Sequence, residues 1–276
     1  ELAKIALAVF FASYMVERAE LLSQGTLKVG RYLFVDPKYL APLVVAWGLS
    51  LTIFTFENDL GSSFLFFALF VSMLWVSTGR NEYLAIGGVL FAVGAGFAAK
   101  VIGHAKTRIG TWRNPWPHYN TTGYQIIQAQ FAMAAGGVFG DGPGLGSPQR
   151  IPEVATDFIF AAIAEELGLF GAVAVLAAFL LMVGTGLRIA VRCERPFDKL
   201  LATGLSLIMG VQVFVILGGV TRIIPLTGIT LPFVSYGGSS LIANYILLAL
   251  LLRISNDSSA PEMVAAGAAA DFTVAA

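Results

Sequence analysis

Residues 158–187 read FIFAAIAEELGLFGAVAVLAAFLLMVGTGL, and this stretch decides the class of fold. Its charged side chains are Glu165 and Glu166, in an otherwise uncharged run. The hydrocarbon core of a membrane requires roughly 20 apolar residues, whereas a helix of about 30 residues is ~45 Å long. We therefore expect a membrane helix that tilts, projects from the bilayer, or bends near Gly168 and Gly171.

The rest of the chain repeats this apolar character. It is 57% hydrophobic and 12% charged, about half the charged fraction of an ordinary soluble domain. Lipid offers no hydrogen-bond partner to an exposed backbone, so the spans should be helical. We predict an all-α polytopic membrane protein with one transmembrane domain over residues 1–254, in contact with membrane lipids. The seven predicted spans cover residues 2–16, 39–56, 60–78, 83–102, 158–187, 200–220 and 239–252.

Charge and the remaining composition narrow the function. The net charge is zero, so no global field favours nucleic acid as a partner. The single cysteine, Cys193, excludes an internal disulfide. Residues 255–276 are polar and then rich in alanine, without a periodic apolar face, and we expect a disordered cytoplasmic tail there.

The distribution of basic residues sets the orientation. Most Lys and Arg residues between the predicted spans, including Arg188, Arg192 and Arg195, fall on one side of the membrane. Cytoplasmic loops carry the excess of Lys and Arg. The long stretch 103–157 should therefore be extracytoplasmic. Five basic residues lie on that outer side, namely Lys106, Arg108, Arg113, Arg150 and Arg222.

Two outer stretches are expected to carry the function. The loop 103–157 exceeds the usual length of a connection, and an amphipathic or re-entrant helix is expected within 119–139, with Tyr124, Ile127, Phe131 and Val138 on one face. The stretch 222–240 is nearly uncharged but is broken by prolines and glycines. Broken backbone at membrane depth is tolerated where it is buried or lines a polar cavity. We therefore expect an outward-facing cavity.

Four ordered motifs match one family. They are ENDLGS at 57–62, RIGTWRNP at 108–115 with GYQ at 123–125, PEVATDFIF at 152–160 with EELG at 165–168, and PLTGITLP at 225–232 with SYGGSS at 235–240. Together they resemble the SEDS family, the FtsW/RodA/SpoVE group. The resemblance extends to about residue 255, with Asn58 in place of a usual proline and Ala155 where many members have histidine.

The resemblance implies a fold of ten membrane helices, of which this chain would carry about the last seven. We expect the natural N-terminal part to be missing, because the chain opens at Glu1 without an initiator Met. The implied activity is that of an inverting peptidoglycan glycosyltransferase that polymerises lipid II at the outer face of the bacterial cytoplasmic membrane. The implied partner is a class B penicillin-binding transpeptidase. The sequence leans slightly toward RodA-like members, and Thr227 contributes to that preference.

Two other functions stay open at this point. A lipid II flippase would also need a broken helix, an outward cavity and intramembrane acids. A non-catalytic scaffold for a transpeptidase would need none of the chemistry.

The carboxylate of Asp157 is the predicted general base, because the matching aspartate is essential in the family. An acceptor sugar hydroxyl must lose a proton as it attacks, and one placed carboxylate can accept it. The competing interpretation is that Asp157 is a helix N-cap, a position that favours aspartate.

Further residues are assigned by motif and chemistry. Cationic groups would stabilise charge on the leaving pyrophosphate. Glu165, Glu166, Glu57 and Asp59 are interpreted as structural or intramembrane acids. His104 and His118 lack the spacing of a metal site, and a divalent cation stays possible without a certain cofactor. The predicted substrate-binding residues are Arg108, Lys106, Trp112, Tyr124, Gln125, Gln128, Thr156, Arg222, Ser235 and Tyr236.

Overall fold

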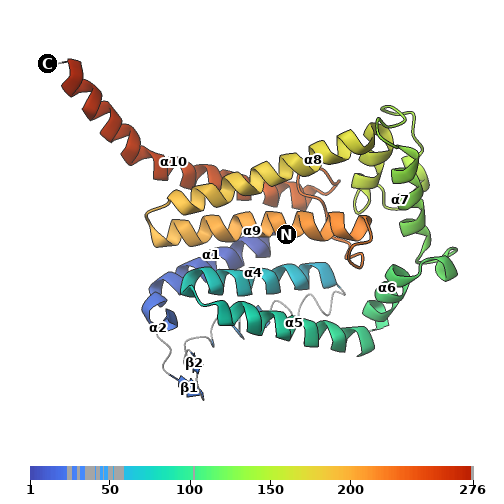
Figure 1. Ribbon diagram of the computed structural model, residues 1–276, viewed down its shortest axis with the longest axis horizontal. Coiled ribbons are helices and arrows are strands. Elements are labelled where there is room, and N and C mark those ends of the chain that lie inside the picture. The colour runs from blue at the N-terminus through green and yellow to red at the C-terminus, as the bar shows by residue number, and fades with distance from the viewer. Residues whose placement is uncertain are drawn as a thin grey trace.

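The computed structural model describes residues 1–23, 27–29, 32–34, 59–101 and 103–274, together with scattered positions between 41 and 52. Long helices lie side by side as a bundle (Figure 1). The elements are α1 (Leu2–Glu17), α2 (Ala19–Ser23), β1 (Leu27–Val29), β2 (Tyr32–Phe34), α4 (Leu60–Thr78), α5 (Asn81–Val101), α6 (Gly103–Arg113), η1 (Trp116–His118), α7 (Tyr124–Ala135), η2 (Pro148–Arg150), α8 (Ile159–Arg192), α9 (Pro196–Val220) and α10 (Gly238–Val274).

Four of the described helices are long and apolar enough to cross a membrane: residues 61–78 of α4, all of α8 and α9, and residues 238–258 of α10. These four match four of the seven predicted spans. The spans predicted at 2–16 and 83–102 are helical, as α1 and α5, but fall outside that set. Most of the span predicted at 39–56 lies outside the described residues.

Helix α9 is the centre of the bundle. Its N-terminal half contributes Leu205 and Ile208 to one apolar core with α1, α4 and α10. Its C-terminal half contributes Val213 and Ile216 to a second core with α7 and α8. Because both cores share α9, α7 is fixed to the same helix as the rest of the bundle.

The bend expected in the long helix occurs at Gly168. This residue has φ 66° and ψ −164° inside α8, a conformation that only glycine adopts readily. The break frees the carbonyls of Glu165 and Glu166, which accept hydrogen bonds of 2.9 and 3.0 Å from the amides of Asp141 and Gly142. The glycine-rich loop after α7 therefore satisfies the backbone that the bend opens.

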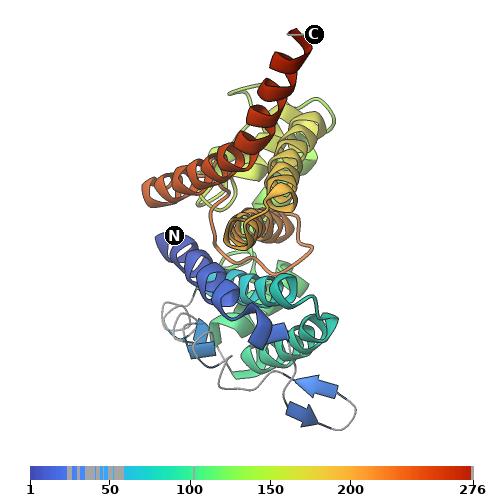
Figure 2. The ribbon, with the colours of Figure 1, turned by 90° about the vertical axis from the view of Figure 1, so that its left-hand side faces the viewer.

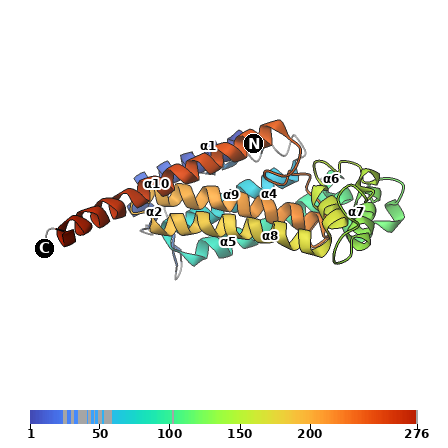
Figure 3. The same ribbon diagram turned by 90° about the horizontal axis from the view of Figure 1, so that it is seen from above.

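The two ends of the bundle differ. Helices α6 and α7 and the irregular loops gather at one end, while the turn between α8 and α9 lies at the other (Figures 1 and 3). That turn carries Arg192 and Arg195. The loop 103–157 and the basic turn predicted to face the cytoplasm are therefore at opposite ends.

The predicted all-α polytopic membrane fold is confirmed by the long helices of the bundle. Two short strands that were not expected, β1 and β2, pair antiparallel. They lie apart from the helices in Figure 2. Tyr, Phe and Val favour strands, but their short runs in an expected loop gave too weak a pattern to detect.

The tail expected to be disordered is helical in the structure. Helix α10 continues to Val274, and its final part leaves the bundle (Figures 1 and 3). Alanine has the highest helix propensity of the amino acids. The missing apolar face argues against packing but does not argue against a helix.

Candidate functional site

A cavity of about 640 Å³ lies where α6, the start of α7, the segment before α8 and the loop after α9 meet. Its lining combines apolar surface with threonine hydroxyls, an amide, a carboxylate and a guanidinium. The lining residues are His104, Thr107, Arg108, Thr111, Thr121, Thr122, Tyr124, Gln125, Ile126, Pro152, Asp157, Leu226 and Gly228. The broken stretch 222–240 therefore lines a cavity, as predicted, through Leu226 and Gly228. That this cavity faces outward stays a prediction.

Asp157 lines this cavity and does not cap α8. The N-cap residue is Phe158, and no side chain caps that helix end. The N-cap interpretation is therefore wrong. The backbone of Asp157 is held instead by Glu153, whose carbonyl accepts from the Asp157 amide at 3.1 Å. Glu153 has φ 56°, an uncommon conformation for a non-glycine residue, which turns the chain just before the carboxylate.

The surroundings of Asp157 make its carboxylate a stronger proton acceptor. Burial raises the pKa of the Asp157 carboxyl above its ordinary value, and the charge of Glu153 raises this pKa further. The Arg108 guanidinium acts in the opposite direction. A raised pKa makes the carboxylate a stronger base than an exposed aspartate.

Arg108 lies in α6 and joins it to the loop after α9. Its Nη1 donates to the carbonyls of Thr227 at 2.6 Å and Leu226 at 3.3 Å. The next residue, Gly228, has φ 79°, and a β-carbon there would lie 3.4 Å from Asp157 Oδ2 and 3.8 Å from Arg108 Nη2. The carboxylate and the guanidinium therefore both approach the backbone of Gly228.

Ser235 and Tyr236 hold the chain that precedes Asp157. The Ser235 hydroxyl donates to the Thr156 carbonyl at 2.5 Å and accepts from the Leu231 amide at 2.8 Å. The Tyr236 amide donates to the Ala155 carbonyl at 2.8 Å. Neither Ser235, Tyr236 nor Thr156 is among the described residues that line the cavity. Their geometry supports Asp157 and gives no direct contact with the cavity.

Arg222 and Trp112 form a mutual clamp outside the cavity lining. The Trp112 Nε1 donates to the Arg222 carbonyl at 2.9 Å, and Arg222 Nη2 donates to the Trp112 carbonyl at 2.9 Å. Arg222 also has φ 63° at the end of α9. Both residues were predicted to bind substrate, but their polar groups are used to fasten α6 to the loop after α9.

The remaining predicted residues lie in three places. Tyr124 and Gln125 line the large cavity. Lys106 is exposed on α6 and is absent from the described lining. Gln128 lines a separate cavity of about 100 Å³ that also contains Glu165.

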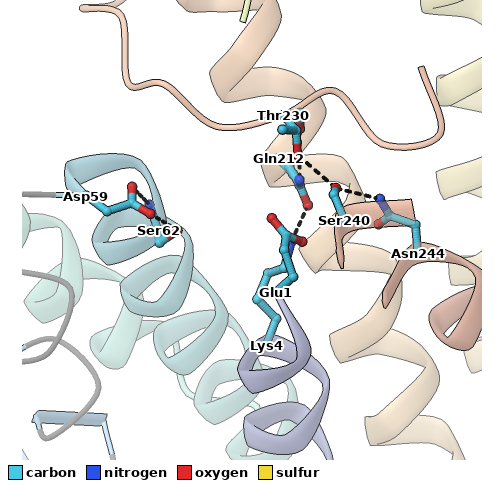
Figure 4. Close-up of polar contacts among 8 residues, drawn as sticks. All are labelled: Glu1, Lys4, Asp59, Ser62, Gln212, Thr230, Ser240 and Asn244. Atoms are coloured by element: carbon cyan, nitrogen blue, oxygen red, sulfur yellow. Dashed lines mark hydrogen bonds and ion pairs between the residues drawn. The ribbon is translucent and has the colours of Figure 1, made fainter. Parts of the chain in front are cut away.

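The predicted structural acids have distinct environments. Glu165 is buried, and its Oε1 accepts from the Ser147 amide at 2.9 Å, which ties the loop after α7 to α8. Glu166 is half-buried. Asp59 caps α4, accepting from the amide and hydroxyl of Ser62 at 3.0 and 2.6 Å (Figure 4). Glu57 lies outside the described residues.

Helix α6 supplies site residues that the sequence reasoning missed. Residues 103–113 were treated as loop, yet His104, Thr107 and Thr111 line the cavity from this helix together with Arg108, which was predicted. Their spacing of three, four and seven residues places them on one helical face. That periodicity is the signal that could have found them. In the described part of the chain, His, Cys, Asp and Glu side chains form no metal-binding cluster.

The amphipathic helix in the outer loop is present as α7, but its buried face was predicted only in part. Ile127 is buried as expected, whereas Phe131 is 52% exposed and Val138 lies beyond the helix end. The buried positions also include Ala129 and Ala132. Small alanines allow α7 to approach α8 closely, which a search for large apolar residues does not detect.

Comparisons with known proteins identify the family of the chain. The family described as "Cell cycle protein" (FtsW/RodA/SpoVE) matches residues 1–260. The chain is 44% identical over 261 residues to the peptidoglycan glycosyltransferase RodA of Mycobacterium tuberculosis, covering 95% of this chain and 56% of the relative. It is 35% identical over 257 residues to a probable peptidoglycan glycosyltransferase FtsW of Geobacter metallireducens, covering 92% of this chain and 66% of that relative.

A solved structure shares the fold. It was described in a study of the structural coordination of polymerization and crosslinking by a peptidoglycan synthase complex. The match has a TM-score of 0.64 at 24% identity and covers 92% of this chain and 82% of that chain. The chain spans little more than half the length of the mycobacterial relative. It belongs to the FtsW/RodA/SpoVE family of cell cycle proteins.

Proposed function

We propose that this chain carries the polymerising site of a peptidoglycan glycosyltransferase, with Asp157 as the general base. The observation that carries the proposal is the half-buried carboxylate of Asp157, with its raised pKa, in a cavity of about 640 Å³ beside Arg108. Because Asp157 does not cap α8, its carboxylate can accept a hydrogen bond from a substrate hydroxyl. The names of the two relatives support the same reaction class.

The proposed substrate is lipid II, a disaccharide joined to undecaprenyl pyrophosphate. The 4-hydroxyl oxygen of the acceptor sugar attacks the anomeric carbon of the donor, and its proton passes to the Asp157 carboxylate. The bond from that carbon to the pyrophosphate oxygen breaks, and the electron pair leaves with the pyrophosphate. A single displacement inverts the anomeric centre and requires no second carboxylate as a nucleophile.

Arg108 is proposed to stabilise charge on the leaving pyrophosphate. One of its terminal nitrogens is held by the carbonyls of Leu226 and Thr227, so the guanidinium is fixed before substrate arrives. A preorganised cation stabilises developing charge without the cost of reorganisation. Tyr124 and Gln125 line the same cavity and are proposed to contact the sugars.

The site is proposed to face the outside of the cytoplasmic membrane. The cavity lies at the end of the bundle opposite the basic turn between α8 and α9. A class B penicillin-binding transpeptidase is the proposed partner, in line with the peptidoglycan synthase complex named for the solved structure. An elongation role is favoured over a division role because the RodA relative is the more similar of the two.

The test is polymerisation by the purified full-length protein with its partner in detergent micelles. Micelles have no two compartments, so a transporter would leave lipid II unchanged. We expect glycan strands from the wild-type protein and a raised donor KM in Arg108→Ala. If the partner's transpeptidase is intact but no strands form, the glycosyltransferase proposal is wrong.

A further inference from the structure

A buried polar network begins at Lys4 in α1. The Lys4 side chain is 7% exposed, and its Nζ donates to Gln212 Oε1 in α9 at 2.8 Å, besides pairing with Glu1 (Figure 4). A buried ammonium within a membrane bundle is costly. Among the described residues that line the Asp157 cavity, Lys4 does not occur. Its cost is therefore not explained by direct contact with that cavity.

Gln212 also contacts the loop after α9. Its side chain is buried at 1% exposure, and its Nε2 donates to the Thr230 carbonyl at 2.8 Å. The two ends of the amide have different partners: the oxygen accepts from an ammonium and the nitrogen donates to a carbonyl. The amide of glutamine fits this pair of partners in one orientation, which neither glutamate nor methionine can reproduce.

Thr230 is also fixed from α10. Its Oγ1 lies 2.8 Å from Ser240 Oγ, which accepts from Asn244 Nδ2 at 3.2 Å (Figure 4). Ser240 and Asn244 are both buried. Helices α9 and α10 thus contact Thr230 directly, and α1 is joined to it through Gln212. Such a loop at membrane depth requires partners for its backbone.

The same loop reaches Asp157. The amide of Leu231, the residue after Thr230, donates to Ser235 Oγ, and that hydroxyl donates to the Thr156 carbonyl. Two residues before Thr230, Gly228 lies against the Asp157 carboxylate. The segment 228–236 is therefore anchored at Thr230 and contacts the Asp157 region on both sides of that anchor.

We propose that Lys4 is a positioning residue for Asp157, acting through Gln212 and Thr230 on the loop 228–236. The proposal rests on the proposed function of Asp157. Lys4 does not touch substrate. It fixes Gln212, whose amide then fixes the loop that sets the position of the carboxylate. A displacement of about 1 Å at a reacting group can lower a rate ~10²-fold.

The variants are made in the full-length protein with its partner and assayed for strand formation. Lys4→Met and Gln212→Met should each lower kcat about 10- to 100-fold while the donor KM changes less than about twofold. The double variant should be no slower than the slower single variant, because both break one chain of contacts. Lys4→Arg, which keeps a donor, should recover part of the rate. Ser206→Ala is the matched control, because this buried hydroxyl of α9 bonds only the Ala202 carbonyl of its own helix in the described contacts.

Gln212→Glu tests the link if the methionine variants fail to fold. It keeps an ionic partner for Lys4 but sets a carboxylate oxygen against the Thr230 carbonyl. We expect the same loss of kcat in this variant. Wild-type kcat in Gln212→Glu, a raised KM with unchanged kcat in Lys4→Met, or multiplying losses in the double variant would each overturn the proposal.

Hydrogen exchange separates this proposal from the assignment of Asp157. In Lys4→Met and Gln212→Glu, the amides of Leu231 and Tyr236 should exchange faster than in the wild type and in Ser206→Ala. If Asp157→Asn polymerises normally, the general-base assignment fails, yet faster exchange would still establish the link from Lys4 to the loop. Unchanged exchange at both amides would refute the link whatever the activity of Asp157→Asn.

Discussion

The Ser235 hydroxyl donates a 2.5 Å hydrogen bond to the carbonyl of Thr156, the residue before Asp157. The two residues are 79 positions apart in sequence. The hydroxyl also accepts from the Leu231 amide, so it joins the loop after α9 to the segment that precedes the Asp157 carboxylate. The loop after α9, together with the motif around Asp157, therefore positions the proposed base.

Removing that hydroxyl should lower activity and stability together. Ser235→Ala leaves the Leu231 amide and the Thr156 carbonyl without their partner, and an unpaired buried group costs about 1–3 kcal/mol. We expect kcat to fall about 10- to 100-fold because Asp157 shifts. Strand formation and thermal unfolding in one detergent measure both effects. Thr203→Val is the control, because it removes a buried hydroxyl that bonds the Lys199 carbonyl near the opposite end of α9. Wild-type kcat in Ser235→Ala would contradict the positioning role.

The pH dependence of the rate should respond to Glu153. The pKa of Asp157 is raised first by burial and then by the Glu153 charge. A general base works when deprotonated, so the rate falls as the pH falls through this raised pKa. Glu153→Gln removes the charge that raises the pKa, and the acid limb of kcat should move to lower pH. Arg108→Met removes a charge that lowers the pKa, and the limb should move to higher pH.

The pH–rate profile of the full-length enzyme measures these shifts. Glu194→Gln, an exposed acid in the turn at the other end of the bundle, should leave the limb in place. Movement of the limb to higher pH in Glu153→Gln would show that another group controls it.

The bend in α8 should require glycine. At Gly168, φ is 66°, and a β-carbon would lie 2.3 Å from the amide nitrogen of Gly140. Gly168→Ala combines a strained backbone, costing about 1–3 kcal/mol, with an overlap against backbone atoms, and it should lower the unfolding temperature. Gly184→Ala, in the same helix with open space around it, should be neutral or stabilising. Equal unfolding temperatures for Gly168→Ala and the wild type would mean that the bend is not maintained.

The orientation can be tested by labelling single cysteines in intact cells. Leu145→Cys, at a position 78% exposed in the outer loop, should react with an impermeant reagent from outside. Glu194→Cys, in the turn between α8 and α9, should react only after the membrane is opened. The native Cys193 is buried, and burial raises the pKa of its thiol, so background labelling should be low. The reverse pattern would place the Asp157 cavity on the cytoplasmic side.

Part of this architecture could be predicted from the sequence, because the length of an apolar run and the positions of its glycines are local features. The run 158–187 is too long for one straight span, and its glycines offered a place to bend, which Gly168 provides. The Asp59 cap and the helix in the outer loop follow from equally local patterns. The broken stretch 222–240 predicted a cavity because prolines and glycines at membrane depth need polar surroundings.

The rest depends on contacts between distant residues. Arg222 and Trp112 were assigned to substrate by charge and motif, but their partners are each other's backbone carbonyls, 110 positions away. The face of α6 was missed because residues 103–113 have the mean composition of a loop, although the spacing of the cavity-lining positions fits one face of a helix. The Lys4–Gln212 contact spans 208 positions and has no local signal.

The central claim is that the Asp157 carboxylate accepts the proton of the attacking hydroxyl. Asp157→Asn keeps the size of the side chain but cannot take up that proton. Because Asp157 does not cap α8, the folded, membrane-inserted protein should persist. Lipid II should still bind if Arg108 and its neighbours hold the pyrophosphate. The direct measurement is the rate of glycan-strand formation by full-length Asp157→Asn with its partner, with donor binding measured in the same preparation. We predict intact binding and a rate reduced about 10²- to 10⁴-fold. Strand formation near the wild-type rate in that preparation would contradict the account and assign the base to another residue.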